Sequence, residues 1–141
     1  MALIARFLID TSAAARMRHP VVAGRLSPLI EAGQVATCAT LDAEALYSAR
    51  SPSDYEQVRA DRQRAYEYLR TEDRHWQAAF AAQRELARTG RHRAGGIADL
   101  LTAVLADEHR LTLLHYDSGF DTAGEVINFD HRWVTERGTL P

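Results

Sequence analysis

The chain has 141 residues, of which 46% are hydrophobic and 26% are charged, and its formal net charge is −2 at pH 7. This length and composition fit one globular domain over residues 1–141 and leave no room for a second one. The apolar runs are far shorter than the roughly 20 residues that cross a bilayer, and residues 1–4 lead directly into strand-like sequence. We therefore expect a soluble, cytoplasmic protein without a membrane partner.

Charge is unevenly distributed along the chain. All 17 basic residues are arginines, with ten of them against seven acids in residues 50–93 and three against eight acids in residues 94–141. An acidic patch repels nucleic acid unless a metal neutralises it, whereas a basic stretch can hold phosphates. The interleaved acids favour a solvated helical face for residues 59–70. His92, between two arginines, indicates either an RNA phosphate contact or a solvated loop.

The first half of the chain repeats a pattern of strand, cap and helix. It predicts a strand at residues 6–10, a helix at 13–17 capped by Thr11 and Ser12, a helix at 21–32 ended by Gly33, a strand at 34–38 and a helix at 41–49 capped by Thr40. The lone Cys38 cannot form an internal disulfide, so we expect it to pack as a small buried residue.

The second half begins with a long helical region. Residues 54–89 follow a break at Ser51-Pro52-Ser53 and predict a helical hairpin interrupted near residues 71–73, with Tyr66, Leu69, Trp76, Ala79, Phe80 and Leu86 on its apolar side. The remaining predicted elements are a helix at 97–106, a strand at 111–116, a short helix at 120–124 and a fourth strand at 126–129. Strands joined by helices predict an α/β fold, with a parallel sheet covered on both faces.

Four carboxylates, Asp10, Glu44, Asp99 and Asp117, stand at the edges of apolar segments. Asp10 and Asp117 follow predicted strands, and ligands of open parallel sheets bind outside the carboxyl ends of the strands. Asp99 interrupts the apolar helix at 97–106, where a buried charge is costly unless it is compensated. Each acid also has a structural interpretation: Asp10 as a helix cap, Glu44 as a solvated acid, Asp99 as a first-turn acid and Asp117 as a turn former.

Converging carboxylates would supply oxygen ligands to a divalent cation. Such a set suits Mg²⁺ or Mn²⁺, which activate water and neutralise the leaving oxygen in phosphodiester hydrolysis. Ser12 or Thr11 would orient Asp10, and Asp121, four residues after Asp117, is an accessory candidate. The chain has no dinucleotide fingerprint, P-loop, paired-cysteine zinc signature or His-Glu-x-x-His motif.

The acids lie in an ordered set of short motifs. In chain order these are Ile9-Asp10-Thr11-Ser12, Glu44 on the helix after the second strand, Ile97-Ala98-Asp99-Leu100-Leu101 and His115-Tyr116-Asp117-Ser118-Gly119-Phe120-Asp121. The set resembles a PIN domain, and specifically the VapC-type toxin ribonucleases, over essentially the entire chain. The resemblance implies that Asp10, Glu44, Asp99 and Asp117 bind Mg²⁺, with Ser12 as a supporting polar residue and Asp121 as an accessory acid.

The resemblance also implies a fold, an activity and partners. The fold would be a three-layer α/β/α domain with a central, mainly parallel sheet of four or five strands. The activity would be that of an endoribonuclease, in a homodimer that a cognate VapB-type antitoxin neutralises. This chain has Ser48 where many relatives place a glycine four residues after Glu44, and Gly119 where an acid often follows Asp117. The first departure affects helix packing, and the second affects the fourth ligand position.

Two alternative functions fit parts of the sequence. A catalytically silent PIN-like module would bind RNA or protein without a filled metal site. An aspartyl phosphoacceptor or phosphatase would use Asp10 as its nucleophile, but Ser12 stands where the phosphatase pattern has a second acid, and the chain has no lysine. The leading hypothesis is therefore a Mg²⁺-dependent toxin ribonuclease, with Mn²⁺ as a substitute, that cleaves transfer, ribosomal or messenger RNA.

Overall fold

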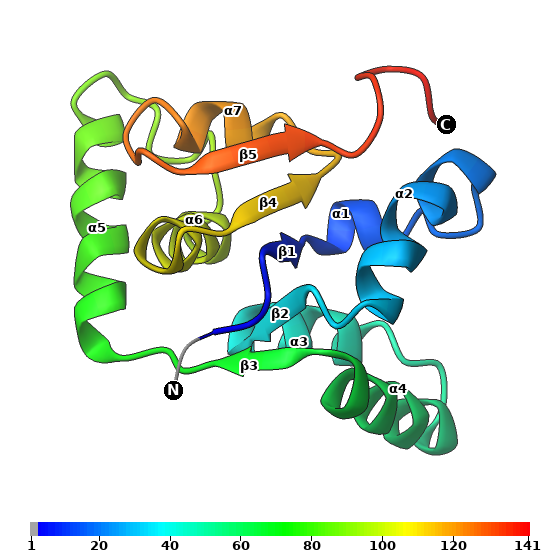
Figure 1. The fold of residues 1–141 in the computed structure, drawn as a ribbon. Helices are drawn as coiled ribbons and strands as arrows, with labels where there is room; N and C mark the ends of the chain where they lie inside the picture. Colours follow the sequence, from blue (N-terminus) through cyan, green and yellow to red (C-terminus); the bar gives the residue numbers. More distant parts are fainter. Residues whose placement is uncertain (1–2) are drawn as a thin grey trace.

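A five-stranded sheet organises the structure, a computed structural model that describes residues 3–141. The strands are β1 (Phe7–Ile9), β2 (Val35–Cys38), β3 (Glu67–Leu69), β4 (Thr112–His115) and β5 (Asp130–Trp133). They lie in the order β3-β2-β1-β4-β5, and every neighbouring pair is parallel. The helices are α1 (Thr11–Ala14), α2 (Pro20–Glu31), α3 (Ala39–Tyr47), α4 (Pro52–Ala65), α5 (Asp73–Ala87), α6 (Ile97–His109) and α7 (Gly119–Ala123). Helices flank the sheet on both sides (Figure 1), which confirms the predicted α/β class and a five-stranded parallel sheet.

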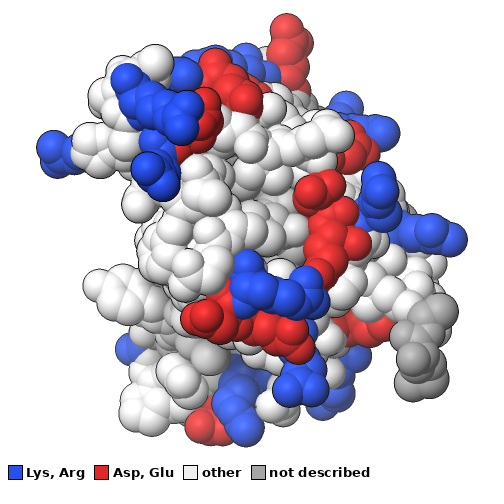
Figure 2. All heavy atoms as spheres, turned by 90° about the vertical axis from the view of Figure 1, so that its left-hand side faces the viewer, with Lys and Arg blue, Asp and Glu red and all other residues white. Residues whose placement is uncertain are grey.

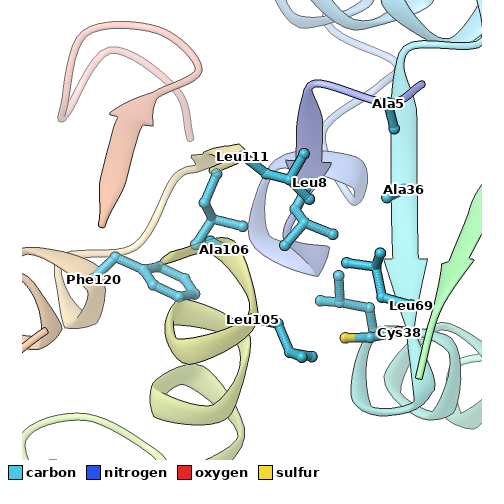
Figure 3. Packing of buried hydrophobic residues seen from close by; sticks show 11 residues of the cluster. Ala5, Leu8, Ala36, Cys38, Leu69, Leu105, Ala106, Leu111 and Phe120 are labelled. Carbon is cyan, nitrogen blue, oxygen red and sulfur yellow. The ribbon is translucent and has the colours of Figure 1, made fainter. Parts of the chain in front are cut away.

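Side chains alternate between the two faces of the sheet. Leu8 and Cys38 belong to a buried cluster with Leu105 of α6, and Figure 3 shows these side chains facing one another from β1, β2 and α6. Ile9, which follows Leu8, and Val35, three residues before Cys38, pack instead in a second cluster with residues of α1 and α2. Successive strand residues point to opposite faces, so strands with apolar residues at consecutive positions need helices on both. The burial of Cys38 is as expected.

Helix α5 forms an outer layer against α6. Its buried residues Ala79, Ala82 and Leu86 share a third cluster with Leu100 and Leu101 of α6. In the described residues, no helix is long and apolar enough to cross a membrane.

The predicted helical hairpin is wrong at its centre. Helix α4 ends at Ala65, Tyr66 has extended backbone angles, and residues 67–69 form the edge strand β3 before α5 begins at Asp73. The Glu67 carboxylate accepts a hydrogen bond from the Ala5 N–H at 2.8 Å, which fastens this strand to the start of the chain. Phe80, predicted on the apolar side, is 46% exposed.

The predicted fourth strand at residues 126–129 is also wrong. Val126 and Ile127 pack against the α5–α6 cluster, and the strand begins four residues later, as β5. Residues of β5 alternate between exposed and half-buried positions. Strand β5 is an edge strand with charged outward residues, so it has no continuous apolar run. The strand was therefore predicted at the apolar residues 126–129 that precede it.

The caps of α1, α3 and α4 differ from the sequence prediction. Asp10, not Thr11 or Ser12, is the N-cap of α1, and α3 starts one residue before Thr40, with Cys38 at its N-cap position. Ser51 caps α4, because its hydroxyl accepts the Asp54 N–H at 3.0 Å, so the helix begins at Pro52.

Candidate metal centre

The four candidate acids come from four elements that meet at one edge of the sheet. Asp10 directly follows β1, and Asp117 lies two residues beyond the end of β4, its parallel neighbour. Glu44 lies within α3, and Asp99 lies in the first turn of α6. Because parallel strands end on the same side, the fold brings the first two acids together and adds the others from the flanking helices.

Asp10 is held rigidly at the end of the central strand. It is 3% exposed, and its Oδ2 accepts a hydrogen bond from the Ser12 N–H at 2.9 Å. The Ser12 hydroxyl in turn accepts the N–H of Tyr116 at 2.9 Å, which connects the start of α1 to the end of β4. Capping α1 occupies one carboxylate oxygen of Asp10, so the structural role predicted as an alternative is real and leaves the other oxygen for a ligand role.

Glu44 is oriented by Thr11, one of the two residues that were predicted to support Asp10. The Thr11 hydroxyl donates to Oε2 of Glu44 at 3.0 Å, so Thr11 orients Glu44 and not Asp10. Both residues line one open hollow, together with Ala43, Tyr47 and Ser48. One carboxylate oxygen of Glu44 is therefore held by the protein.

Gly119 lies between the remaining two acids. Its N–H donates to Oδ1 of Asp117 at 2.8 Å. A Cβ atom at Gly119 would lie 3.3 Å from that same oxygen and 3.6 Å from Oδ2 of Asp99. The glycine that departs from the family pattern therefore keeps the space beside Asp99 and Asp117 free of a side chain.

The four carboxylates act on one another electrostatically. The pKa of Asp99 is raised to about 7, first by burial and then by the charges of Asp10, Asp117 and Glu44. The pKa of Asp10 is raised by burial, with a further contribution from Asp117, and the pKa of Glu44 is raised by burial and by Asp10. The acids are thus close enough to disfavour each other's charged forms.

None of the four acids takes part in an ion pair between residues 3 and 141. Partly buried carboxylates without a cationic side chain are costly, and a divalent cation would remove that cost. The donor set consists of oxygens alone, which suits hard cations. The group is therefore a possible acidic metal site whose ligands fit Mg²⁺ or Mn²⁺ chemically.

Among the described residues, the group whose ligand atoms lie within 4.8 Å of one another is a neighbouring one, formed by His115, Asp121 and His131. The hydrogen bonds assign the tautomers: Nδ1 of His115 accepts the Asp117 N–H at 3.2 Å, so Nε2 carries the proton and donates to Nδ1 of His131 at 3.0 Å. Burial and His131 lower the pKa of His115 to about 4, so its ring is neutral. In this tautomer, Nε2 of His115 offers no lone pair to a cation.

Asp121 contacts this histidine group. Its Oδ1 accepts the Trp133 Nε1–H at 3.3 Å and lies 3.9 Å from Nδ1 of His131. Its accessory role at the metal stays a prediction. Sequence reasoning missed the contribution of His131 and Trp133, because both lie on β5, the strand that was placed four residues too early.

The arginine-rich segments are mostly paired with acids. In α4, Arg64 bonds to Asp61 at 2.7 Å with both side chains exposed, which fits the predicted solvated face. On the α5 side of the molecule, basic and acidic side chains are intermixed (Figure 2), and one such exposed pair is Arg88 with Glu85, at 3.5 Å. Arg91, beside His92, is paired with Glu125 at 2.6 Å. This face therefore presents no uniform basic surface to RNA.

Comparison with known proteins agrees with this geometry. The PIN domain family matches residues 7–126, most of the chain and all four candidate acids. The chain belongs to the PIN domain family. It is 38% identical to Ribonuclease VapC21 of Mycobacterium tuberculosis over 134 residues, covering 95% of this chain and 97% of the relative. Its identity to Ribonuclease VapC51 of the same species is 34% over 135 residues, covering 96% and 97%.

Solved structures share the fold of this PIN domain at low sequence identity. VapBC2 from Rickettsia felis, bound to a DNA fragment from the promoter, superposes with a TM-score of 0.70 at 16% identity, covering 89% of this chain and 96% of that one. VapBC-5 from Mycobacterium tuberculosis gives a TM-score of 0.61 at 22% identity, covering 92% and 98%. The predicted PIN fold is confirmed.

Proposed function

We propose that this PIN-domain protein is a Mg²⁺-dependent endoribonuclease and the toxin of a VapBC-type toxin–antitoxin pair. The observation that carries the proposal is the convergence of four acids that have no cationic partner within residues 3–141, in a chain that matches 97% of a relative named Ribonuclease VapC21. The alignment covers nearly the full length of both proteins, so the similarity extends over that entire ribonuclease and is not confined to one part of it.

The chain's own residues would prepare the site for a cation. Asp10, Glu44, Asp99 and Asp117 would hold Mg²⁺, with Mn²⁺ as a substitute. A bound Mg²⁺ supplies activated water and neutralises charge on the phosphate and on the leaving oxygen. The Ser12 N–H and the Thr11 hydroxyl each fix one carboxylate, which limits how far these ligands must reorganise.

The carboxyl group of Asp99 would release a proton when the cation binds. Its pKa of about 7 in the metal-free protein means that a large fraction of the molecules hold this proton at neutral pH. A carboxylate ligand must be ionised, so cation binding and deprotonation are coupled.

RNA is the substrate class that the relatives' names support. Cleavage of transfer, ribosomal or messenger RNA would inhibit translation and growth. The structural neighbours from VapBC complexes support a VapB-type antitoxin as the partner. A basic side chain of such an antitoxin would neutralise the same unpaired acids that a cation neutralises. A homodimer is proposed on the family resemblance alone.

Cleavage of total cellular RNA by the purified, antitoxin-free protein tests the proposal. We expect discrete cuts with Mg²⁺, none with EDTA, and none with Asp99→Asn, which removes a ligand charge with little change of shape. Sequencing of the fragment ends identifies the RNA and the cut site. Asp42→Asn is the matched control, because Asp42 is paired with Arg62 outside the site. Intact RNA after incubation with folded, Mg²⁺-loaded protein would instead support the catalytically silent binding module.

A further inference from the structure

Tyr47 is unusually exposed for an aromatic residue next to a candidate active site. It is 92% exposed, the highest value among the large hydrophobic side chains that the structure describes. It is the last residue of α3, one turn after Glu44. Side chains three residues apart on a helix have Cβ atoms about 5–6 Å apart on the same face. The tyrosine ring therefore lies beside a candidate metal ligand.

Tyr47 and Glu44 share an open hollow. Its volume is about 440 Å³, and Thr11, which holds Glu44, forms part of its wall. A nucleotide whose phosphate lies at the acids would have its base within reach of this ring. An aromatic ring with one face in water offers a stacking surface to any base, because every base has a π-face.

A second hollow, which shares no lining residue with the first, lies between the end of α3 and the start of α4. It measures about 520 Å³, and its wall includes Leu46, Arg50 and Tyr55. Arg50 is exposed, and within residues 3–141 its guanidinium takes part in no ion pair, although its backbone N–H donates to Asp54 at 2.9 Å. Aromatic rings interleaved with a free arginine form the pattern that binds single-stranded nucleic acid. Tyr47 therefore shares a hollow with Glu44, and Arg50, three residues later, lines the neighbouring one.

We propose that Tyr47 stacks on a base adjacent to the scissile phosphate, and that the RNA strand leaves the acids past Arg50. The inference rests on the proposed ribonuclease function and names the residue that positions its single-stranded substrate. A protein partner would also cover an exposed tyrosine. The hollow that Tyr47 shares with Glu44, and the charge of Arg50, which has no ion pair within residues 3–141, favour a polyanion instead.

Steady-state cleavage of the mapped RNA site by three variants tests the role of the ring. Tyr47→Ala should raise KM by about 10-fold or more, the typical effect of losing one base–aromatic stack, with a smaller change in kcat. Tyr47→Phe keeps the stacking face and should stay within about 2-fold of the wild type. Tyr68→Ala is the matched control, since Tyr68 is 55% exposed on β3 and does not line either hollow. Equal KM values for the wild type and Tyr47→Ala would overturn the inference.

Photocrosslinking gives a readout that does not depend on turnover. The wild-type protein is mixed with a short single-stranded RNA of 5-iodouridines, with Ca²⁺ in place of Mg²⁺, irradiated and mapped by mass spectrometry. Crosslinks at Tyr47, absent at Tyr68, support the stack, whereas crosslinks elsewhere without Tyr47 overturn it. If the wild type cleaves no RNA, the proposed function fails, and the crosslink still decides whether this surface binds RNA. If Tyr47→Ala weakens only antitoxin binding, the surface belongs to the antitoxin and the inference is wrong.

Discussion

Two acids on the same helix, Asp42 and Glu44, have opposite electrostatic surroundings. Asp42 accepts hydrogen bonds from Nε of Arg62 and from the Thr37 hydroxyl, each at 2.8 Å. Arg62 is only 15% exposed and also packs over the ring of Tyr66. Among the described residues, the one donor to the carboxylate of Glu44 is the Thr11 hydroxyl, and the pKa of Glu44 is raised by burial and by the neighbouring Asp10. The fold neutralises Asp42, which links two helices, and within residues 3–141 it provides no cationic side chain for Glu44.

The largest expected effect is a difference in RNA cleavage between a variant of Glu44 and a variant of Asp42. Glu44→Gln should lower RNA cleavage by about 100-fold or more, because it removes the charge of a proposed metal ligand. Removing a residue that only hydrogen-bonds to a metal ligand typically lowers activity by about 10–100-fold. Asp42→Asn should leave cleavage per folded molecule within a few-fold of the wild type. Rates measured with equal amounts of folded protein, checked by circular dichroism, compare them. Similar losses in both variants would remove the distinction.

The Asp42–Arg62 pair and the group of four acids should also differ in how they affect stability. Breaking the pair should destabilise the protein, whereas removing one charge from the acids should stabilise it. Arg62→Leu leaves Asp42 partly buried without its guanidinium, and should lower the free energy of unfolding by about 2–3 kcal/mol, less than for a fully buried pair. Asp99→Asn should raise this free energy in the metal-free protein, because it removes one of four repelling carboxylates. Urea unfolding followed by circular dichroism gives both values. A stabilising Arg62→Leu or a destabilising Asp99→Asn would contradict the comparison.

The pH dependence of stability should reveal the unpaired acids. The pKa of Asp99 is raised from 3.8 to about 7, so the unfolded chain loses this proton at lower pH than the folded protein. The free energy of unfolding of the metal-free protein should therefore fall as pH rises from about 4 to about 7, and then level off. Burial raises the pKa of Asp10 and Glu44 in the same direction.

Urea unfolding across this pH range, with the wild type and Asp99→Asn, measures the slope, which the variant should reduce. A Mg²⁺ concentration of about 100 times the Kd at pH 8 should add about 2.7 kcal/mol at that pH. The same concentration should add less at pH 5, since Mg²⁺ binds ionised carboxylates. An identical slope in Asp99→Asn would show that Asp99 does not carry the effect.

The smallest effect is expected from the residue that orients Glu44. Thr11→Val keeps the shape of the side chain and removes the hydroxyl that donates to Glu44 at 3.0 Å. Cleavage should fall by about 10-fold, the lower end of the range for groups that support metal ligands, with a weaker apparent affinity for Mg²⁺. Mg²⁺ titration of the cleavage rate measures both. Thr40→Val, on the same helix as Glu44, is the control.

Much of the fold was readable because its signals are local. Gly33, which has a positive φ of 68°, ends α2 as predicted, and the apolar strands β1, β2 and β4 were placed within one or two residues. Residues 67–69 and 130–133 were missed for a common reason. Both are short edge strands whose pairing with β2 or β4, and not their own composition, makes them strands.

By itself, the sequence determined the alternation of strands and helices and the four acids at the edges of apolar segments, because periodicity and capping depend on neighbouring residues. Only the tertiary structure decided which acids are neutralised. It pairs Asp42 with Arg62, twenty residues away, and places Asp121 against β5. It also leaves Tyr47 exposed beside Glu44. These outcomes depend on distances between segments that are remote in the chain, and electrostatic energy is set by such distances and by burial.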